Sequence, residues 1–346
     1  MTLRTSIKPA RRHVGSLLQG LAERAPSLSV LPCLLLLALL TQPPAHAGTF
    51  KPFLPYPAYD SVVINPFDPA DESARLLRIL QPFYAKNTGK QLIIQDLPGR
   101  GGIGAWAEVA ARGDDGYTLA LTDLPALTML SLRTPPPFTL EELRNVCLLA
   151  SMPLALWAPA QGPHGDLYAL VNQAFDNPEQ VIIAGTGTFT PQHLATLRFN
   201  RLAGMKTAYR AHTGSEAARM ATLDGHAQAF WGPASPSLAA DPLLRPLAIA
   251  AEQRHPLLPQ VPTFAELSYD LTETSYFGLA ISSGTNPQIA QSVSAAFLNI
   301  ARNPEFQAQL GAAGFFPAPA GAHEVVEYLK SLRDYYDAEI KDYGLK

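Results

Sequence analysis

The chain has 346 residues, of which 47% are hydrophobic and 16% charged, with 32 prolines and a formal net charge of −3. This composition excludes a disordered polyelectrolyte and argues against a nucleic-acid-binding protein, which would be basic. Two cysteines are too few for a disulfide scaffold or for a zinc or iron–sulfur site built on cysteine. The length allows one large domain or two of medium size.

The N-terminal segment has the arrangement of a secretory signal. Basic residues open it, an apolar run follows at Leu28–Leu40, and the small residues Ala45 and Ala47 precede Gly48. A membrane anchor is the alternative, but a membrane-spanning helix needs about 20 apolar residues, whereas this run has about thirteen. We therefore expect export to the periplasm with removal of residues 1–47 near Ala47, by a route that the sequence leaves open.

The predicted mature chain is more acidic than the whole. Residues 48–346 contain 21 Lys and Arg against 28 Asp and Glu, a net charge of −7. Cys33 is lost with the leader, so Cys147 has no intrachain partner and is expected to be buried as a small hydrophobic residue.

Beyond the leader, short apolar runs alternate with segments of helical periodicity. In chain order the sequence predicts strands at 61–64, 91–95, 117–121, 179–183 and 247–250. It predicts helices between these strands, one marked by Leu76, Leu80 and Phe83, one at 103–112 closed by Gly113, and two at 191–202 and 216–223. Two C-terminal helices follow, with apolar faces at Ile289, Val293, Ala296 and Ile300 and at Val325, Leu329, Leu332, Tyr336 and Ile340. Such alternation predicts an α/β fold with largely parallel sheets. About 300 residues exceed one usual core, which favours two lobes.

The first strand-to-helix loop covers residues 65–71 and contains two acids. Asp68 is a good N-cap, Pro69 suits the first helical position, and Asp71 lies in the first turn. Both acids are therefore open to two interpretations, helix capping or contact with a ligand.

The second loop matches a dinucleotide fingerprint, with Gly99, Gly101 and Gly104 in a G-x-G-x-x-G pattern and Asp123 following the next strand. The fingerprint usually opens its domain, however, and here another βα unit precedes it. An exported protein also meets little NAD. An exported oxidoreductase using NAD or flavin remains the alternative function.

The third loop is rich in glycine and threonine, with Thr186, Thr188, Thr190 and His193 close to a predicted helix start. Glycines let backbone N–H groups point at a ligand, and a helix N-terminus favours an anion. We therefore expect this loop to contact a ligand, with a simple turn as the alternative interpretation.

Hydrolytic motifs such as G-x-S-x-G and H-E-x-x-H are absent from the sequence, and the histidines are scattered without metal-ligand spacing. We therefore expect no catalytic residues, no metal site, no cofactor and no enzymatic activity.

Six motifs in order resemble the extracytoplasmic solute receptors of tripartite tricarboxylate transporters, the Bug-type receptors. They are Asp71-x-x-Ala74-Arg75, Pro98-Gly-x-Gly-Gly-Ile-Gly104, Asp115-Gly116-Tyr117-Thr118-Leu119, Gly187-x-x-Thr190-x-Gln192-His193-Leu194, Leu258-Pro259-x-Val261-Pro262-Thr263, and Phe277-Gly278-Leu279 with Gly284-Thr285-x-Pro287. The resemblance covers residues 61 to 345.

The resemblance implies a type II periplasmic-binding-protein fold, in which two α/β lobes joined by crossover strands close over a small organic solute in the cleft between them. The implied divisions are a first lobe at 48–155, a second lobe at 156–272 and a return to the first at 273–346. The family's cleft loops fall on residues 65–71, 121–124, 185–190, 212–215 and 231–235. The ligand-binding residues expected from these loops and their neighbours are Phe67, Asp68, Asp71, Thr122, Asp123, Thr186, Thr188, Thr190, His193, Arg210, His212, Gly232 and Ser235.

This sequence departs from the family pattern inside those loops. The 65–71 loop is shorter and has lost two glycines, and the family's Tyr-Lys has become His212-Thr213. With Asp68, Asp71 and Asp123 facing the cleft, a tricarboxylate would meet unpaired acids, which is costly in a poorly solvated site. A zwitterion or an amide-bearing carboxylate is the better expectation.

We conclude from the sequence that the protein is a monomeric periplasmic receptor. It is expected to capture an organic acid or an amino-acid-like solute and to deliver it to the permease subunits of a tripartite tricarboxylate-type transporter. A receptor that senses the solute and signals to a membrane kinase is a further alternative.

Overall fold

The computed structural model describes residues 56–112, 115–133 and 138–345. The predicted leader at residues 1–47 and the predicted helix stop at Gly113 lie outside this description. Residues 54–346 form one unit, in which the described strands make a ten-stranded mixed sheet.

The first lobe is built on three parallel strands with a helix after each. Strand β1 (Ser61–Asn65) pairs with both β2 (Leu92–Asp96) and β3 (Thr118–Asp123). Helix α2 (Glu72–Thr88) follows β1, the 3-10 turn η1 (Arg100–Gly102) and α3 (Ile103–Ala111) follow β2, and α4 (Leu124–Ser131) follows β3. The predicted elements are thus found here, and Leu76, Leu80 and Phe83 are buried as expected.

The second lobe repeats this construction. Strand β5 (Ile182–Thr186) pairs in parallel with β6 (Ala208–His212) and β7 (Ala229–Pro233). The helices are α5 (Leu167–Asp176), α6 (Pro191–Ala203), α7 (Ser215–Leu223) and the short α8 (Pro236–Ala239), and β8 (Leu244–Ile249) follows.

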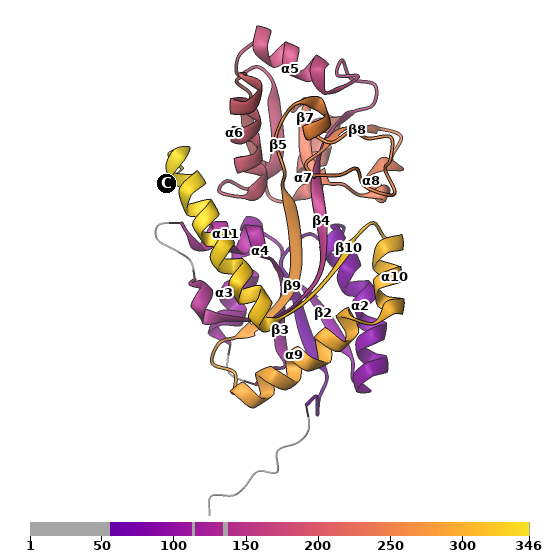
Figure 1. The fold of residues 1–346 in the computed structure, drawn as a ribbon, viewed down its shortest axis with the longest axis vertical. Coiled ribbons are helices and arrows are strands. Elements are labelled where there is room, and N and C mark those ends of the chain that lie inside the picture. The colour runs from indigo at the N-terminus through magenta and orange to yellow at the C-terminus, as the bar shows by residue number, and fades with distance from the viewer. Residues whose placement is uncertain (1–55, 113–114, 134–137, 346) are drawn as a thin grey trace, which may run out of the picture. The chain divides into compact units, whose positions relative to one another are not determined.

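Two long strands run between the lobes, as Figure 1 shows in magenta for β4 and orange for β9. Strand β4 (Leu143–Pro159), preceded by the 3-10 turn η2 (Leu140–Glu142), pairs antiparallel with β9 (Thr274–Ser282) as far as Pro153 and with β7 from Leu154 onward. The expectation of largely parallel sheets was therefore incomplete. The apolar run of β4 is buried along almost its whole length and shows no alternation, so its sequence carries no period-2 signal.

The C-terminal segment returns to the first lobe. The turn η3 (Ala265–Leu267) precedes β9, and α9 (Pro287–Ala301), α10 (Pro304–Ala312), β10 (Phe316–Gly321) and α11 (Ala322–Asp342) follow it. The stripe predicted for the last helix is confirmed, since Val325, Leu329, Leu332, Tyr336 and Ile340 are all buried. In α9 the buried face is shifted, with Ala290, Val293, Phe297, Ile300 and Ala301 inward.

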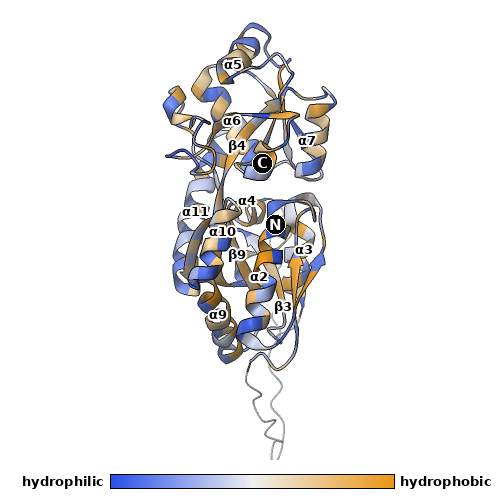
Figure 2. Cartoon of the chain, turned by 90° about the vertical axis from the view of Figure 1, so that its right-hand side faces the viewer, coloured by the Kyte–Doolittle hydropathy of each residue, from blue (hydrophilic) through white to orange (hydrophobic). Residues whose placement is uncertain are grey.

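The predicted strand at 179–183 lies three residues later, at Ile182–Thr186. The residue Glu179 has a left-handed φ of 65° and its N–H donates to the Lys206 carbonyl, so it belongs to the turn before the strand. Figure 2 shows apolar colour concentrated on the strands and on the inner sides of the helices of both lobes. No helix within the described ranges is long and apolar enough to cross a membrane.

Candidate functional site

A cavity of about 310 Å³, called the cleft cavity below, lies between loops of the two lobes. Its lining residues come from the loops that follow β1, β2 and β6, from the end of β5 and from the first turn of α7. They are Pro66, Phe67, Asp68, Asp71, Pro98, Gly99, Gly101, Thr186, Thr213, Gly214 and Ala217. Ligands of open α/β sheets bind in this position, outside the carboxyl ends of the parallel strands.

Asn65 at the end of β1 shapes the first of these loops. Its side-chain amide donates to the Phe67 carbonyl at 3.0 Å and to Asp96 Oδ1 at 2.8 Å. Its Oδ1 accepts from the Ser73 hydroxyl at 3.1 Å, which ties the loop to α2. Phe67 packs edge-on against Trp106, with ring centroids 6.1 Å apart. The loop is therefore held by its own hydrogen bonds and presents Phe67 to the cavity.

Both predicted acids of this loop line the cavity. Asp68 Oδ1 accepts from the Ala70 N–H at 2.9 Å, so this carboxylate also orders the turn before α2. Asp71 precedes α2, and its Oδ2 accepts from the Ser215 hydroxyl of the second lobe at 3.3 Å. Burial, reinforced by the charge of Asp68, raises the pKa of Asp71 to about 7. Asp71 therefore gains or loses a proton near neutral pH.

The glycine-rich loop after β2 approaches the cavity with its backbone. Gly101 lines it with a φ of 71°, and Gly102 has a φ of 102°. A Cβ on Gly102 would lie 2.8 Å from Trp106, whose indole N–H donates to the Leu121 carbonyl at 2.9 Å. The sequence pattern of this loop thus serves a tight turn against a buried tryptophan.

Thr186 is the residue of the third predicted loop that lines the cavity. Thr190 is buried, its hydroxyl accepts from the His193 N–H at 3.4 Å, and it caps α6. His193 stacks on Tyr209 with ring centroids 4.6 Å apart, and burial lowers its pKa. Thr188 is exposed. Thr190 and His193 therefore organise the loop rather than line the cavity.

Arg210 and His212 lie beside the cavity rather than in its lining. Arg210 is exposed, and its Nη1 donates to the His226 carbonyl at 3.2 Å. The His212 carbonyl accepts from the Gly187 N–H at 2.9 Å, which joins the third loop to β6. Burial and the charge of Arg210 lower the pKa of His212.

Thr122 and Asp123, at the end of β3, also lie outside the lining. Thr122 is fully buried, and Asp123 Oδ2 accepts from the Ser275 hydroxyl of β9 at 2.8 Å. Burial raises the pKa of Asp123 to about 7. Gly232 is a packing position, because a Cβ there would lie 2.9 Å from the Phe230 ring.

Side chains at the start of α2 form hydrogen bonds with the second lobe. The Ser235 hydroxyl donates to Glu72, and Arg75 Nη1 donates to the Ser237 hydroxyl at 2.7 Å. With the Asp71–Ser215 bond, these contacts form what we call the cleft latch, made of Asp71, Glu72, Arg75, Ser215, Ser235 and Ser237. Sequence analysis singled out Asp71 and Ser235 as candidate ligand contacts. Arg75 appeared there only within the Asp71-x-x-Ala74-Arg75 motif and Ser215 only within the 212–215 loop, whereas Glu72 and Ser237 were missed.

The arrangement offers binding groups but no reactive constellation. Within the described ranges, no group of three or more His, Cys, Asp or Glu side chains could hold a metal ion. Four helices begin just after the loops that contribute to the cavity, and their N-termini favour an anion. The cavity therefore combines anion-attracting backbone with two carboxylates.

The profile of the tripartite tricarboxylate transporter family receptor matches residues 76–345. The chain belongs to this receptor family. A relative, the protein BugT of Bordetella pertussis, is 30% identical over 240 residues, which cover 68% of this chain and 74% of BugT. The resemblance seen in the sequence motifs is thereby confirmed.

Solved structures show the same fold. The Rhodopseudomonas palustris protein Rpa4515, solved with adipate, has a TM-score of 0.78 at 21% identity, covering 84% of this chain and 98% of its own. MatC of the same organism, solved with malate, has a TM-score of 0.74 at 21% identity, covering 82% and 100%. The fold is thus the two-lobed periplasmic-binding-protein fold. Members of this family are periplasmic solute receptors and not enzymes, so the oxidoreductase alternative is set aside.

Proposed function

We propose that this receptor captures a small carboxylate-bearing solute in the cleft cavity by closure of its two lobes. The observation that carries the proposal is the cavity itself, which is lined by loops of both lobes at the carboxyl ends of parallel strands. Relatives of the same fold were solved with adipate and malate. A carboxylate of the solute would accept hydrogen bonds from backbone N–H groups of the glycine-containing loops, next to helix N-termini.

We further propose that the solute carries an amine or amide beside its carboxylate. Asp68 and Asp71 both line the cavity, and a purely anionic ligand would face them at close range. A carboxylate beside a like charge is destabilised, whereas a protonated amine would compensate Asp71 and keep it ionised. An amino-acid-like zwitterion matches both parts of the site, since its carboxylate suits the backbone N–H groups and its amine suits the two aspartates.

Calorimetric titration of the receptor with citrate, malate, adipate and a panel of amino acids tests this specificity. We expect the tightest binding from an amino acid, and loss of about tenfold or more of its affinity in Asp71→Asn, since a charged hydrogen bond of about 1.5–3 kcal/mol is removed. Glu305→Gln, on the exposed start of α10, is the matched control and should bind as the unaltered protein does. Tighter binding of citrate than of every amino acid would refute the zwitterion, and an absence of binding by all of them would refute the carboxylate proposal.

The lobe limits are proposed at residues 48–155, 156–272 and 273–346. Support comes from the strand pairing, because β4 changes partner between Pro153 and Leu154, and the Leu154 N–H donates to the Glu273 carbonyl at 2.9 Å just before β9 begins. Closure would then bend the chain near these residues.

Delivery and export are proposed together. The closed, solute-loaded receptor would dock as a monomer on the permease subunits of a tripartite tricarboxylate-type transporter, after cleavage of the leader near Ala47. N-terminal sequencing of the protein recovered from the periplasm tests the cleavage, with Gly48 as the expected first residue. Uptake of the bound solute in cells with and without the receptor tests the delivery.

A further inference from the structure

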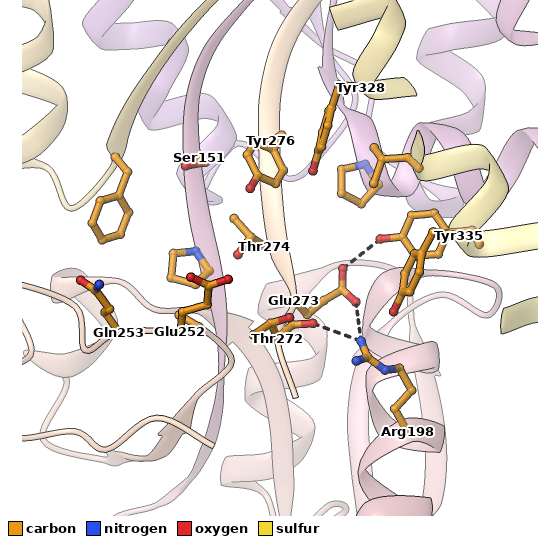
Figure 3. Close-up of a pocket in the computed structure, with 16 residues that line it drawn as sticks. Ser151, Arg198, Glu252, Gln253, Thr272, Glu273, Thr274, Tyr276, Tyr328 and Tyr335 are labelled. Carbon is orange, nitrogen blue, oxygen red and sulfur yellow. Dashed lines mark hydrogen bonds and ion pairs between the residues drawn. The ribbon is translucent and has the colours of Figure 1, made fainter. Parts of the chain in front are cut away.

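A second cavity, of about 590 Å³, lies where the chain crosses between the lobes (Figure 3). We call it the hinge cavity. Its lining includes Ser151 of β4 and Tyr276 of β9 from the crossover strands, Tyr328 of α11 from the first lobe, and Glu252 from the second lobe. It shares no lining residue with the cleft cavity. Its volume is in the range of small-molecule sites.

The guanidinium group of Arg198 in the hinge cavity already has partners. Arg198 Nη1 donates to the Thr272 carbonyl at 3.1 Å and lies 3.9 Å from Glu273 Oε2. Its Nε lies 3.8 Å from Glu339 Oε2, and its guanidinium lies 5.9 Å from the ring centre of Tyr335. Arg198 is therefore engaged by a backbone carbonyl, two carboxyl groups and a tyrosine ring, and offers little to an anionic ligand.

A carboxylate at the rim of the cavity, by contrast, has no ion-pair partner among the described residues. Glu252 is exposed and takes part in none of the ion pairs that the described residues form. In Figure 3 it lies on the same side of the cavity as Glu273, whose Oε1 accepts from the Tyr336 hydroxyl at 2.9 Å. The charge available to a ligand is therefore negative.

Aromatic rings complete the lining. Tyr276 and Tyr328 pack edge to face with centroids 4.9 Å apart, and their hydroxyl ends point toward the side of the cavity that Glu252 occupies (Figure 3). Phe316, also in the lining, is 36% exposed and packs on His255 at 5.0 Å. Tyrosine hydroxyl oxygens accept hydrogen bonds and a free carboxylate attracts positive charge, so together with the partly exposed ring of Phe316 they favour an organic cation.

We propose that the hinge cavity is a second binding site, in which the hydroxyl groups of Tyr276 and Tyr328, the ring of Phe316 and the unpaired carboxylate of Glu252 hold a small organic cation. The site is independent of the solute proposed for the cleft.

Calorimetric titration of the exported protein with choline and with putrescine tests the site, and 3,3-dimethylbutan-1-ol serves as the uncharged isostere of choline. We expect at least one of the two cations to bind about tenfold or more tightly than the alcohol. Glu252→Gln and Phe316→Leu should each weaken that cation, since they remove the charge and one aromatic face. Both side chains are exposed, so unchanged thermal unfolding will verify that the variants fold.

Asp71→Asn distinguishes the two cavities, because the cleft cavity is also lined by carboxylates, which attract cations. We expect this variant to bind the cation as the unaltered protein does. Binding that is lost in Asp71→Asn and kept in Glu252→Gln would overturn the proposal, as would equal affinity for cation and alcohol, or no binding of either cation.

Discussion

Gly102 is the residue on which the loop after β2 depends most directly. Its φ of 102° is one that side-chain-bearing residues rarely adopt, and a Cβ would lie 2.8 Å from Trp106. We expect Gly102→Ala to lower the free energy of unfolding by about 1–3 kcal/mol, because strained backbone and a steric conflict add together. Urea denaturation followed by tryptophan fluorescence measures this change.

Gly104 provides the control two residues later. It lies in α3, has no left-handed φ, and a Cβ there would meet nothing within 4 Å. Gly104→Ala should therefore be neutral or should stabilise the protein by up to about 1 kcal/mol, as alanine does in a helix. Equal destabilisation by both variants would contradict the role assigned to Gly102.

At the scale of single elements, the first turn of α2 serves both cavity and closure. Asp71 faces the cleft cavity, while Glu72 and Arg75 bond to serines of the second lobe. We expect Ser237→Ala to lower the affinity for the cleft solute by roughly threefold to tenfold, because one hydrogen bond across the lobes, worth about 1 kcal/mol, is lost from the closed form.

Calorimetry with the tightest-binding amino acid measures the effect. Ser292→Ala is the matched control, since the Ser292 hydroxyl donates to the Gln288 carbonyl within α9 and contacts no other lobe. Affinity that is unchanged in Ser237→Ala would mean that the cleft latch contributes nothing to solute capture.

At the scale of the whole molecule, buried carboxyl groups lie at both cavities and at the crossover. Burial raises the pKa of Asp71 and of Asp123 to about 7 and that of Glu273 to about 8. In the unfolded chain these groups titrate near pH 4, so between about pH 4 and 8 the folded protein binds more protons. The free energy of unfolding should therefore fall as the pH rises through this window, by up to about 1.4 kcal/mol per pH unit for each group.

Urea denaturation at about pH 5 and about pH 8 measures this slope. Glu273→Gln removes the group with the highest of the three pKa values, so this variant should show a flatter dependence in the upper part of the window. A free energy of unfolding that rises from pH 5 to pH 8 would contradict the assignment.

The sequence predicted helices better than strands for a physical reason. The stripe of α11 repeats at helical spacing and faces one core, so its five buried residues were found without the structure. Strand β4 is buried on both faces and is interrupted by Pro153, so neither periodicity nor propensity marks it. The crossover strands were available only as an implication of the family resemblance, and their antiparallel pairing was seen only in the structure.

The candidate site was predictable where its residues follow strands directly. Phe67, Asp68, Asp71 and Thr186 line the cleft cavity, and each lies in or beside a loop read from local patterns. Asp123 also follows a strand, but its side chain is bonded to Ser275, a residue 152 positions away in the chain. No local signal reports such a partner.

The sequence motifs indicated the receptor family through their resemblance to it. The α/β alternation and the loops that border the cleft followed from the short-range spacing of apolar, glycine and capping residues. The tertiary structure decided which side chains meet. In the fold, Asp71 accepts a hydrogen bond from Ser215, and Asp123 accepts one from Ser275 of β9. The hinge cavity is lined by strands and helices that are far apart in sequence. Those contacts arise when β4 and β9 cross between the lobes, and long-range pairing of this kind leaves no periodic trace in the chain.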